Sequence, residues 1–144
     1  MDQRDRSGDL RSAFLRESSF VLPGTVWREA HDGASMEYPQ TSAVLGTLTV
    51  GFGWDEITIF VGPRGHHTHL GVDESPSGAQ AEQITEAARA ALSFVRDVFQ
   101  DRVSVRWGVL VSGAHSGRRG ATAAGRVWKW LTPWVREAVW SGQT

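Results

Sequence analysis

The sequence predicts an α+β fold: an antiparallel β-meander sheet with one long helix packed on one face, and short helices at the termini. Two observations carry this prediction. Apolar and polar residues alternate over residues 47–72, and turn-forming residues interrupt the alternation twice. Residues 79–99 then carry apolar residues at helical spacing. An antiparallel sheet must bury one face, and the helix supplies its cover.

The register of two hairpins follows from the apolar pattern. A loop at residues 53–56 places apolar residues opposite each other, in the pairs Phe52–Ile57, Val50–Ile59 and Leu48–Val61. A turn at 62–65, with proline at its second position, predicts a second hairpin. Successive side chains of a strand point to opposite faces. We therefore expect the third strand to direct one set of residues to the core, namely His66, Thr68, Leu70 and Val72. The opposite face then holds His67 and His69, across from Phe60 and Thr58.

The remaining elements have weaker signals. We expect a short helix at residues 1–18 with a frayed first turn, and an irregular segment at 19–42 with one edge strand. A strand at 103–111, a glycine-rich loop at 112–125 and a last strand at 126–131 follow the long helix. Thr132 and Pro133 then favour the start of a short C-terminal helix. The length of 144 residues favours a single domain spanning residues 1–144.

Composition narrows the setting in which the chain works. The sequence holds no cysteine, which excludes disulfides and thiolate metal sites. No apolar run is long enough to cross a membrane, and the first residues are charged where a signal peptide would be apolar. We expect a cytoplasmic protein without a membrane partner. Fourteen arginines against one lysine are typical of a GC-rich bacterial genome.

Charge is distributed unevenly along the chain. Residues 29–86 carry nine acidic residues and one basic residue, whereas residues 102–136 carry seven basic residues and no acidic one. Two interpretations stay open. The halves form complementary, solvated faces of one fold, or the basic half binds an acidic partner. The glycine-rich loop fits a nucleic-acid or phosphate binder, through Arg118, Arg119, Arg126 and Lys129.

The histidines raise the alternative of a metal-dependent enzyme. His67 and His69 share a strand face, as two ligands of a divalent metal would. A catalytic metal needs a third protein ligand, for which Asp73, Glu74 or His115 are the candidates. The pattern G-x4-H-x-H-x4-E resembles the first metal motif of cupins, which implies His67, His69 and Glu74 as ligands. Its first gap is one residue short, and a second cupin motif is missing from the sequence.

The preferred interpretation is a binding protein. The sequence shows no nucleophile motif and no catalytic constellation, so an enzyme is less favoured. Aromatic and arginine side chains are the usual anchors of protein interfaces. The candidate binding residues are Trp54, Phe60, Arg106, Arg118 and Arg119. The four tryptophans of residues 128–140 fit either the core or an interface, and a homo-oligomer is also compatible with the pattern.

A resemblance over residues 44–142 points the same way. The chain runs from a strand at Ile57–Gly62 through His67 and His69 to a helix, then through Asp101–Trp107 to Trp140–Gly142. This order resembles a group of small uncharacterised bacterial proteins, some of them of the immunity type that neutralises toxins. The resemblance implies a protein partner. It assigns no catalytic residue. We expect no cofactor, with a divalent metal at His67 and His69 as the alternative.

Overall fold

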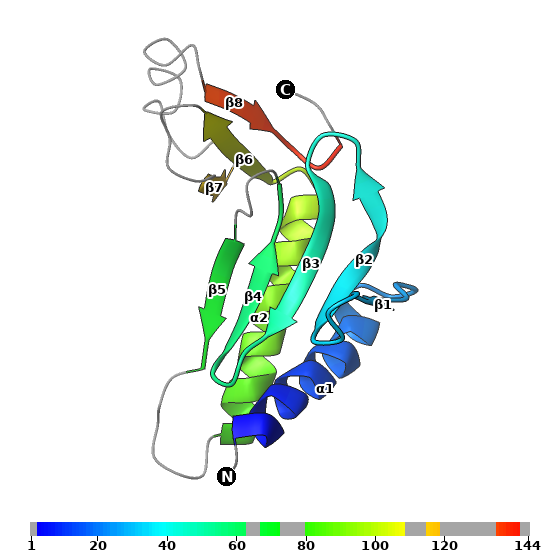
Figure 1. Ribbon diagram of the computed structural model, residues 1–144, viewed down its shortest axis with the longest axis vertical. Helices are drawn as coiled ribbons and strands as arrows, with labels where there is room; N and C mark the ends of the chain where they lie inside the picture. Colours follow the sequence, from blue (N-terminus) through cyan, green and yellow to red (C-terminus); the bar gives the residue numbers. More distant parts are fainter. Residues whose placement is uncertain (1–2, 63–66, 73–79, 109–114, 119–134, 142–144) are drawn as a thin grey trace.

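The computed structural model describes residues 3–62, 67–72, 80–108, 115–118 and 135–141 (Figure 1). These residues form a five-stranded antiparallel sheet of order β1-β2-β3-β4-β5, a three-stranded antiparallel sheet of order β7-β6-β8, and two helices. The bounds are α1 (Gln3–Val21), β1 (Arg28–Glu29), β2 (Ser35–Ser42), β3 (Gly46–Phe52), β4 (Glu56–Phe60), β5 (His67–Gly71), α2 (Gln80–Phe99), β6 (Val103–Gly108), β7 (His115–Arg118) and β8 (Val135–Ala138). The α+β prediction is confirmed.

The predicted register of the meander is confirmed as well. Phe52 lies opposite Ile57 and Val50 opposite Ile59 between β3 and β4. Between β4 and β5, the opposite pairs are Phe60–His67, Thr58–His69, Ile59–Thr68 and Ile57–Leu70. The predicted partner of Val61, His66, lies outside the described residues. The inward-facing residues Leu48, Val50, Ile57 and Ile59 are fully buried, so a slip of one residue would turn this apolar set to the other face.

Both helices bury their apolar stripes against the same sheet face. The apolar stripe of α2 packs against the inward-facing residues of β3 and β4, and together they form one hydrophobic cluster. Leu10 and Phe14 of α1 are fully buried in that cluster. The prediction of a short helix over residues 1–18 therefore understated α1, which extends to Val21 and packs along α2. Neither described helix combines the length and the apolar character that crossing a bilayer requires.

The segment predicted as irregular contains two strands, β1 and the eight-residue β2. Asp32 holds the turn between them: its carboxylate accepts hydrogen bonds from the backbone N–H groups of Ala34 and Ser35 and from the Ser35 hydroxyl. The register of β2 against β3 shifts between Glu37 and Thr41, around Pro39. Such an irregularity accommodates a proline inside a strand, and it hides the alternation by which a strand is usually recognised.

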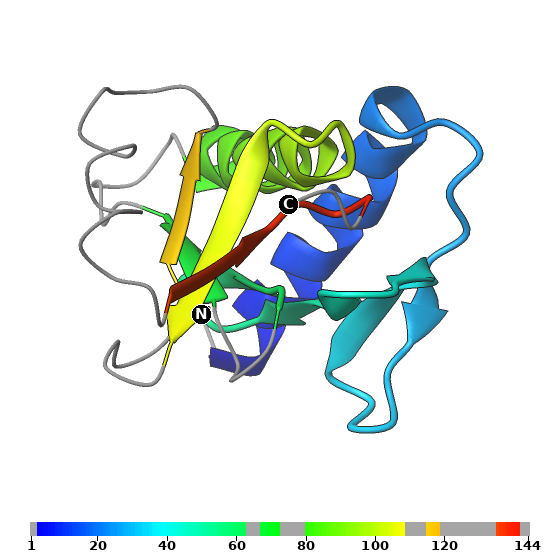
Figure 2. The ribbon, with the colours of Figure 1, turned by 90° about the horizontal axis from the view of Figure 1, so that it is seen from above.

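The C-terminal part of the described chain forms a second sheet from β7, β6 and β8 (Figure 2). The strand expected at 103–111 is confirmed as β6 over its described part, and β7 lies within the segment predicted as a glycine-rich loop. The predicted C-terminal helix is wrong, because residues Val135–Ala138 form β8 and pair with β6. Pairing with a distant strand has overridden the local helix-start signal. The strand expected at 126–131 lies outside the described residues.

The two sheets meet at Gly62, directly after the end of β4. Gly62 has a φ of +88°, and a Cβ atom at this position would lie 2.9 Å from the Cγ1 atom of Val105 in β6. Two contacts of Trp140 hold the last described residues against the rest of the fold. The Ser42 hydroxyl donates a hydrogen bond to the Trp140 carbonyl, and the indole of Trp140 packs on Phe99. Trp140 is thus part of the core packing, whereas Trp128, Trp130 and Trp134 lie outside the described residues.

Candidate functional site

The candidate site lies on the face of the five-stranded sheet that points away from α2. Strands β3 and β4 lie in front of α2 in Figure 1, so that view looks onto this face. We call it the open face, because both described helices bury their side chains on the opposite side. Residues alternate between faces along a strand, so β4 presents Glu56, Thr58 and Phe60 here, and β5 presents His67 and His69.

Three rings form a continuous cluster on the open face. The ring centroids of Phe60 and His67 lie 5.5 Å apart, and those of His67 and His69 lie 4.8 Å apart in a perpendicular arrangement. Gly51 of β3 explains the position of the phenyl ring. A Cβ atom at Gly51 would lie 3.4 Å from the Cε2 atom of Phe60, so the ring covers the bare glycine backbone. Phe60 is still 37% exposed, and both histidines are exposed. We call Phe60, His67 and His69 the ring cluster.

Glu56 joins the ring cluster through His69. The Nδ1 atom of His69 lies 2.8 Å from Oε1 of Glu56, and the Thr58 hydroxyl donates to the same oxygen over 3.2 Å. A carboxylate only accepts hydrogen bonds, so Nδ1 of His69 carries the proton in this arrangement.

Sequence reasoning missed Glu56 because it was assigned to the hairpin loop. Two signals were available. Glu56 precedes Thr58 by two residues and Phe60 by four, and alternation along the strand therefore puts all three on the same face. Its direct partner on β5 is Gly71, which has no side chain, so Glu56 can reach diagonally to His69.

The metal site remains a prediction that rests on two side chains. Among the residues that the structure describes, no group of three histidine or carboxylate side chains is arranged to hold a metal ion. Asp73 and Glu74 lie outside the described residues. The backbone of His115 lies in β7 of the second sheet, where it pairs with Arg106.

The other predicted binding residues are spread over the molecule. Trp54 is 42% exposed at the tip of the β3–β4 hairpin, and the guanidinium carbon of Arg6 lies 5.4 Å from its ring centroid. Arg106 is exposed on β6, in the second sheet, and therefore does not lie on the open face. The backbone of Arg118 lies in β7. The basic residues Arg119, Arg126 and Lys129 lie outside the described part of the chain.

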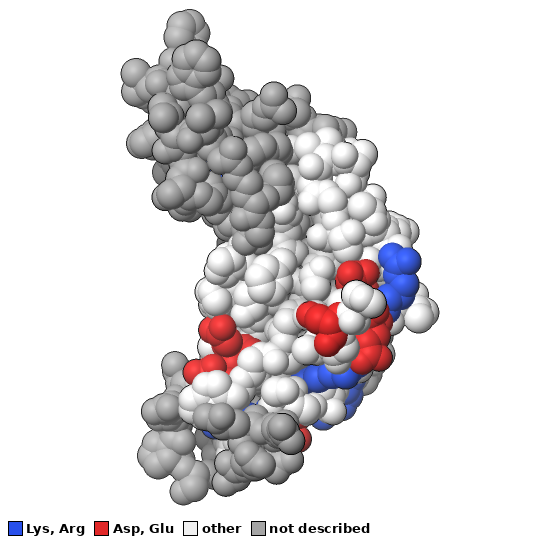
Figure 3. Space-filling view, viewed as in Figure 1, with Lys and Arg blue, Asp and Glu red and all other residues white. Residues whose placement is uncertain are grey.

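Acidic residues lie in two places on the side of the molecule that holds the open face. Figure 3 shows red, acidic surface at the lower left and beside β1 and β2, and blue, basic surface adjoins the second of these. The second place lies across β3 from the ring cluster. The acidic residues of these strands and turns are Glu29, Asp32, Glu37, Asp55 and Glu56. The Ser35 hydroxyl and the nearby backbone N–H groups lower the pKa of Asp32, which keeps this carboxylate ionised. Arg28 lies opposite Glu37 on the open face, and Glu29 pairs with Arg11 of α1, so the carboxylate in contact with the ring cluster is that of Glu56.

Comparison with known proteins gives no match to a family model, to a curated protein or to a solved structure. The resemblance to small bacterial proteins of the immunity type therefore stays a prediction.

Proposed function

We propose that this chain is a small binding protein that recognises another protein through the open face of its five-stranded sheet. One observation carries the proposal: Phe60, His67 and His69 touch one another on an exposed strand face. Aromatic side chains grouped at the centre of a patch, with polar residues around them, are the usual anatomy of a protein interface.

The charge around the ring cluster suggests the chemistry of the partner. Glu56 of β4 contacts the cluster through His69, so a partner with a basic residue beside an apolar centre would be complementary. Complementary charge speeds association and fixes orientation more than it adds affinity. We therefore expect association to slow as ionic strength rises, while the ring cluster supplies most of the affinity.

An inhibitor of the immunity type is the form of binding protein that we favour. The resemblance found in the sequence supports it, since immunity proteins act by covering a toxin and need no catalytic residue of their own. The lack of cysteine supports a cytoplasmic setting, and fourteen arginines against one lysine support a bacterial one. In this proposal, the open face covers a surface of the toxin, with Glu56 beside the ring cluster receiving a basic residue.

Site-specific crosslinking, followed by affinity measurement, tests the proposal. A photoreactive residue at position 67 should capture the partner from the native cell, and the same residue at Glu86, exposed on α2, should not. The partner is then purified and its Kd measured. We expect Phe60→Ala with His67→Ala to weaken binding by about 30-fold, as the loss of an interface hot spot does, and Glu86→Ala to leave the Kd within about twofold. Equal capture at both positions, or an unchanged Kd in the ring-cluster variant, would contradict the proposal.

A further inference from the structure

A pocket of about 430 Å³ lies on the helical layer, between the last turns of α1 and the middle of α2. It is separate from the open face, because it is formed by the two helices alone. Its volume falls within the range of small-molecule sites. The lining residues are Glu17, Phe20, Val21, Arg89, Ser93 and Arg96.

The two walls of the pocket differ in chemistry. Arg89, Ser93 and Arg96 follow one another at helical spacing on α2, which puts their side chains on one face. The two arginines are thus separated by about 10 Å along the helix axis. On the α1 wall, Glu17 faces Arg89, and the rest is apolar: Phe20, which is 76% exposed, and Val21. A polar wall with cationic groups therefore faces an exposed and largely apolar one.

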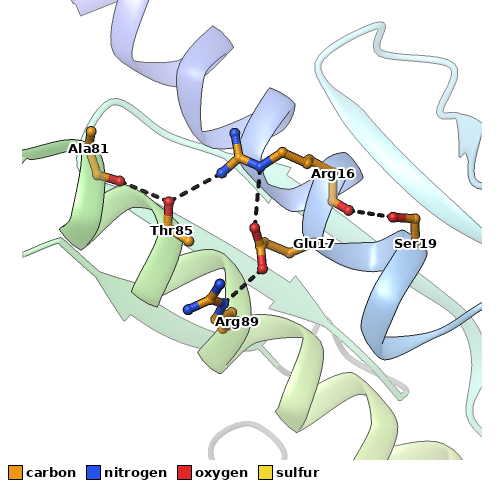
Figure 4. Close-up of polar contacts among 6 residues, drawn as sticks. All are labelled: Arg16, Glu17, Ser19, Ala81, Thr85 and Arg89. Atoms are coloured by element: carbon orange, nitrogen blue, oxygen red, sulfur yellow. Dashed lines mark hydrogen bonds and ion pairs between the residues drawn. The ribbon is translucent and has the colours of Figure 1, made fainter.

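Glu17 fixes the first guanidinium in place (Figure 4). Glu17 is only 6% exposed. The Nε atom of Arg89 donates to Oε2 of Glu17 over 2.8 Å, and the Nε atom of Arg16 donates to Oε1 over 3.2 Å. Arg16 also donates to the Thr85 hydroxyl, which ties α1 to α2. The hydrogen bond from Arg89 lowers the pKa of Glu17, so this carboxylate stays ionised and uses only one edge of the Arg89 guanidinium.

Arg96 has no carboxylate partner among the residues that the structure describes. Its Nη2 atom lies 3.4 Å from the Ser93 hydroxyl, a long hydrogen bond to a neutral group. The lining thus holds two guanidinium groups and one carboxylate, and it carries a net positive charge. A guanidinium with donors to spare, next to an exposed phenyl ring, suits an anion that carries an apolar group.

We propose that this pocket binds a small organic carboxylate with an apolar tail. Arg96 and Ser93 donate hydrogen bonds to the carboxylate, and the positive charge of Arg89 nearby attracts it. Phe20 and Val21 cover the tail. Neither wall is sufficient by itself: a short carboxylate lacks the apolar contact, and a neutral molecule with the same tail lacks the partner for Arg96.

Titration of the full chain with octanoate, octanol and acetate tests this inference, with ¹H–¹⁵N spectra as the readout. Octanoate should produce saturable shifts at residues 20–21 and 89–96. Octanol and acetate should bind at least about tenfold more weakly, because each lacks one of the two contacts. Arg96→Gln should weaken octanoate binding by about tenfold, and Arg28→Gln, a matched change on β1, should leave it within about twofold.

The same spectra show whether each variant is folded, so a loss of binding cannot be confused with a loss of structure. Three results would overturn the inference. They are the absence of saturable shifts in the pocket residues, octanol binding as tightly as octanoate, and unchanged octanoate binding in the folded Arg96→Gln variant.

Discussion

Replacing Gly62 with alanine is expected to destabilise the protein by about 2–5 kcal/mol. Two costs combine at this position. Gly62 has a φ of +88°, in the left-handed region, where a residue with a Cβ atom is less stable by about 1–2 kcal/mol. The new methyl group would also lie 2.9 Å from Cγ1 of Val105, which is fully buried and cannot move outward. Overpacking of this kind costs about 1–3 kcal/mol.

Urea unfolding followed by tryptophan fluorescence measures this change in the free energy of unfolding. Gly46→Ala is the matched control, because Gly46 has a φ of +76° and a Cβ atom there would meet open space. Gly46→Ala should lower the free energy of unfolding by the cost of the left-handed backbone conformation alone, about 1–2 kcal/mol. The Val105→Ala substitution removes the atom that the new methyl group would clash with. The double variant Gly62→Ala/Val105→Ala should therefore lose about 1–3 kcal/mol less stability than the sum of the two single losses. Equal losses for Gly62→Ala and Gly46→Ala, with no coupling to Val105, would refute the close approach of the two sheets.

Two further predictions concern the helical layer. Because the pKa of Glu17 is lowered by folding, its contribution is present above the ordinary glutamate pKa and is lost as pH falls through the lowered value. Glu17→Gln should therefore be less stable than wild type in urea unfolding at about pH 7, with the difference shrinking towards about pH 3, and a constant difference would contradict the ion pair. Phe14→Ala should cost about 3–5 kcal/mol, because Phe14 is fully buried against Trp27 and Phe52. Phe20→Ala, six residues along the same helix and largely exposed, should change stability by less than about 0.5 kcal/mol, and similar losses for both would show that α1 is packed differently.

The meander could be predicted in detail because its information is local. The pairs Phe52–Ile57 and Phe60–His67 follow from short loops and from the alternation of apolar residues within one stretch of chain. The C-terminal strand β8 could not be predicted in this way. Val135 pairs with Gly108, twenty-seven residues earlier, and the local sequence pattern does not predict this pairing. Local signals favoured a helix, and the distant pairing decided the outcome.

The candidate site shows the same division. Parity along β4 and β5 was enough to put His67 and His69 on one face beside Phe60. Arg106 could not be assigned to a sheet, because an alternating strand after a helix is compatible with either the first sheet or a second one. The pocket between α1 and α2 was also beyond sequence reasoning, since Glu17 and Arg89 meet across 72 positions of the chain.

The central claim is that the open face is the surface by which this protein binds its partner. Histidine-selective covalent labelling, with and without the partner purified by crosslinking, tests it most directly. The chain supplies an internal control, because His31 is exposed in the turn between β1 and β2, outside the ring cluster. The proposal predicts that the partner protects His67 and His69 from labelling while His31 reacts as before. Undiminished labelling of His67 and His69 in the saturated complex would show that the partner binds elsewhere.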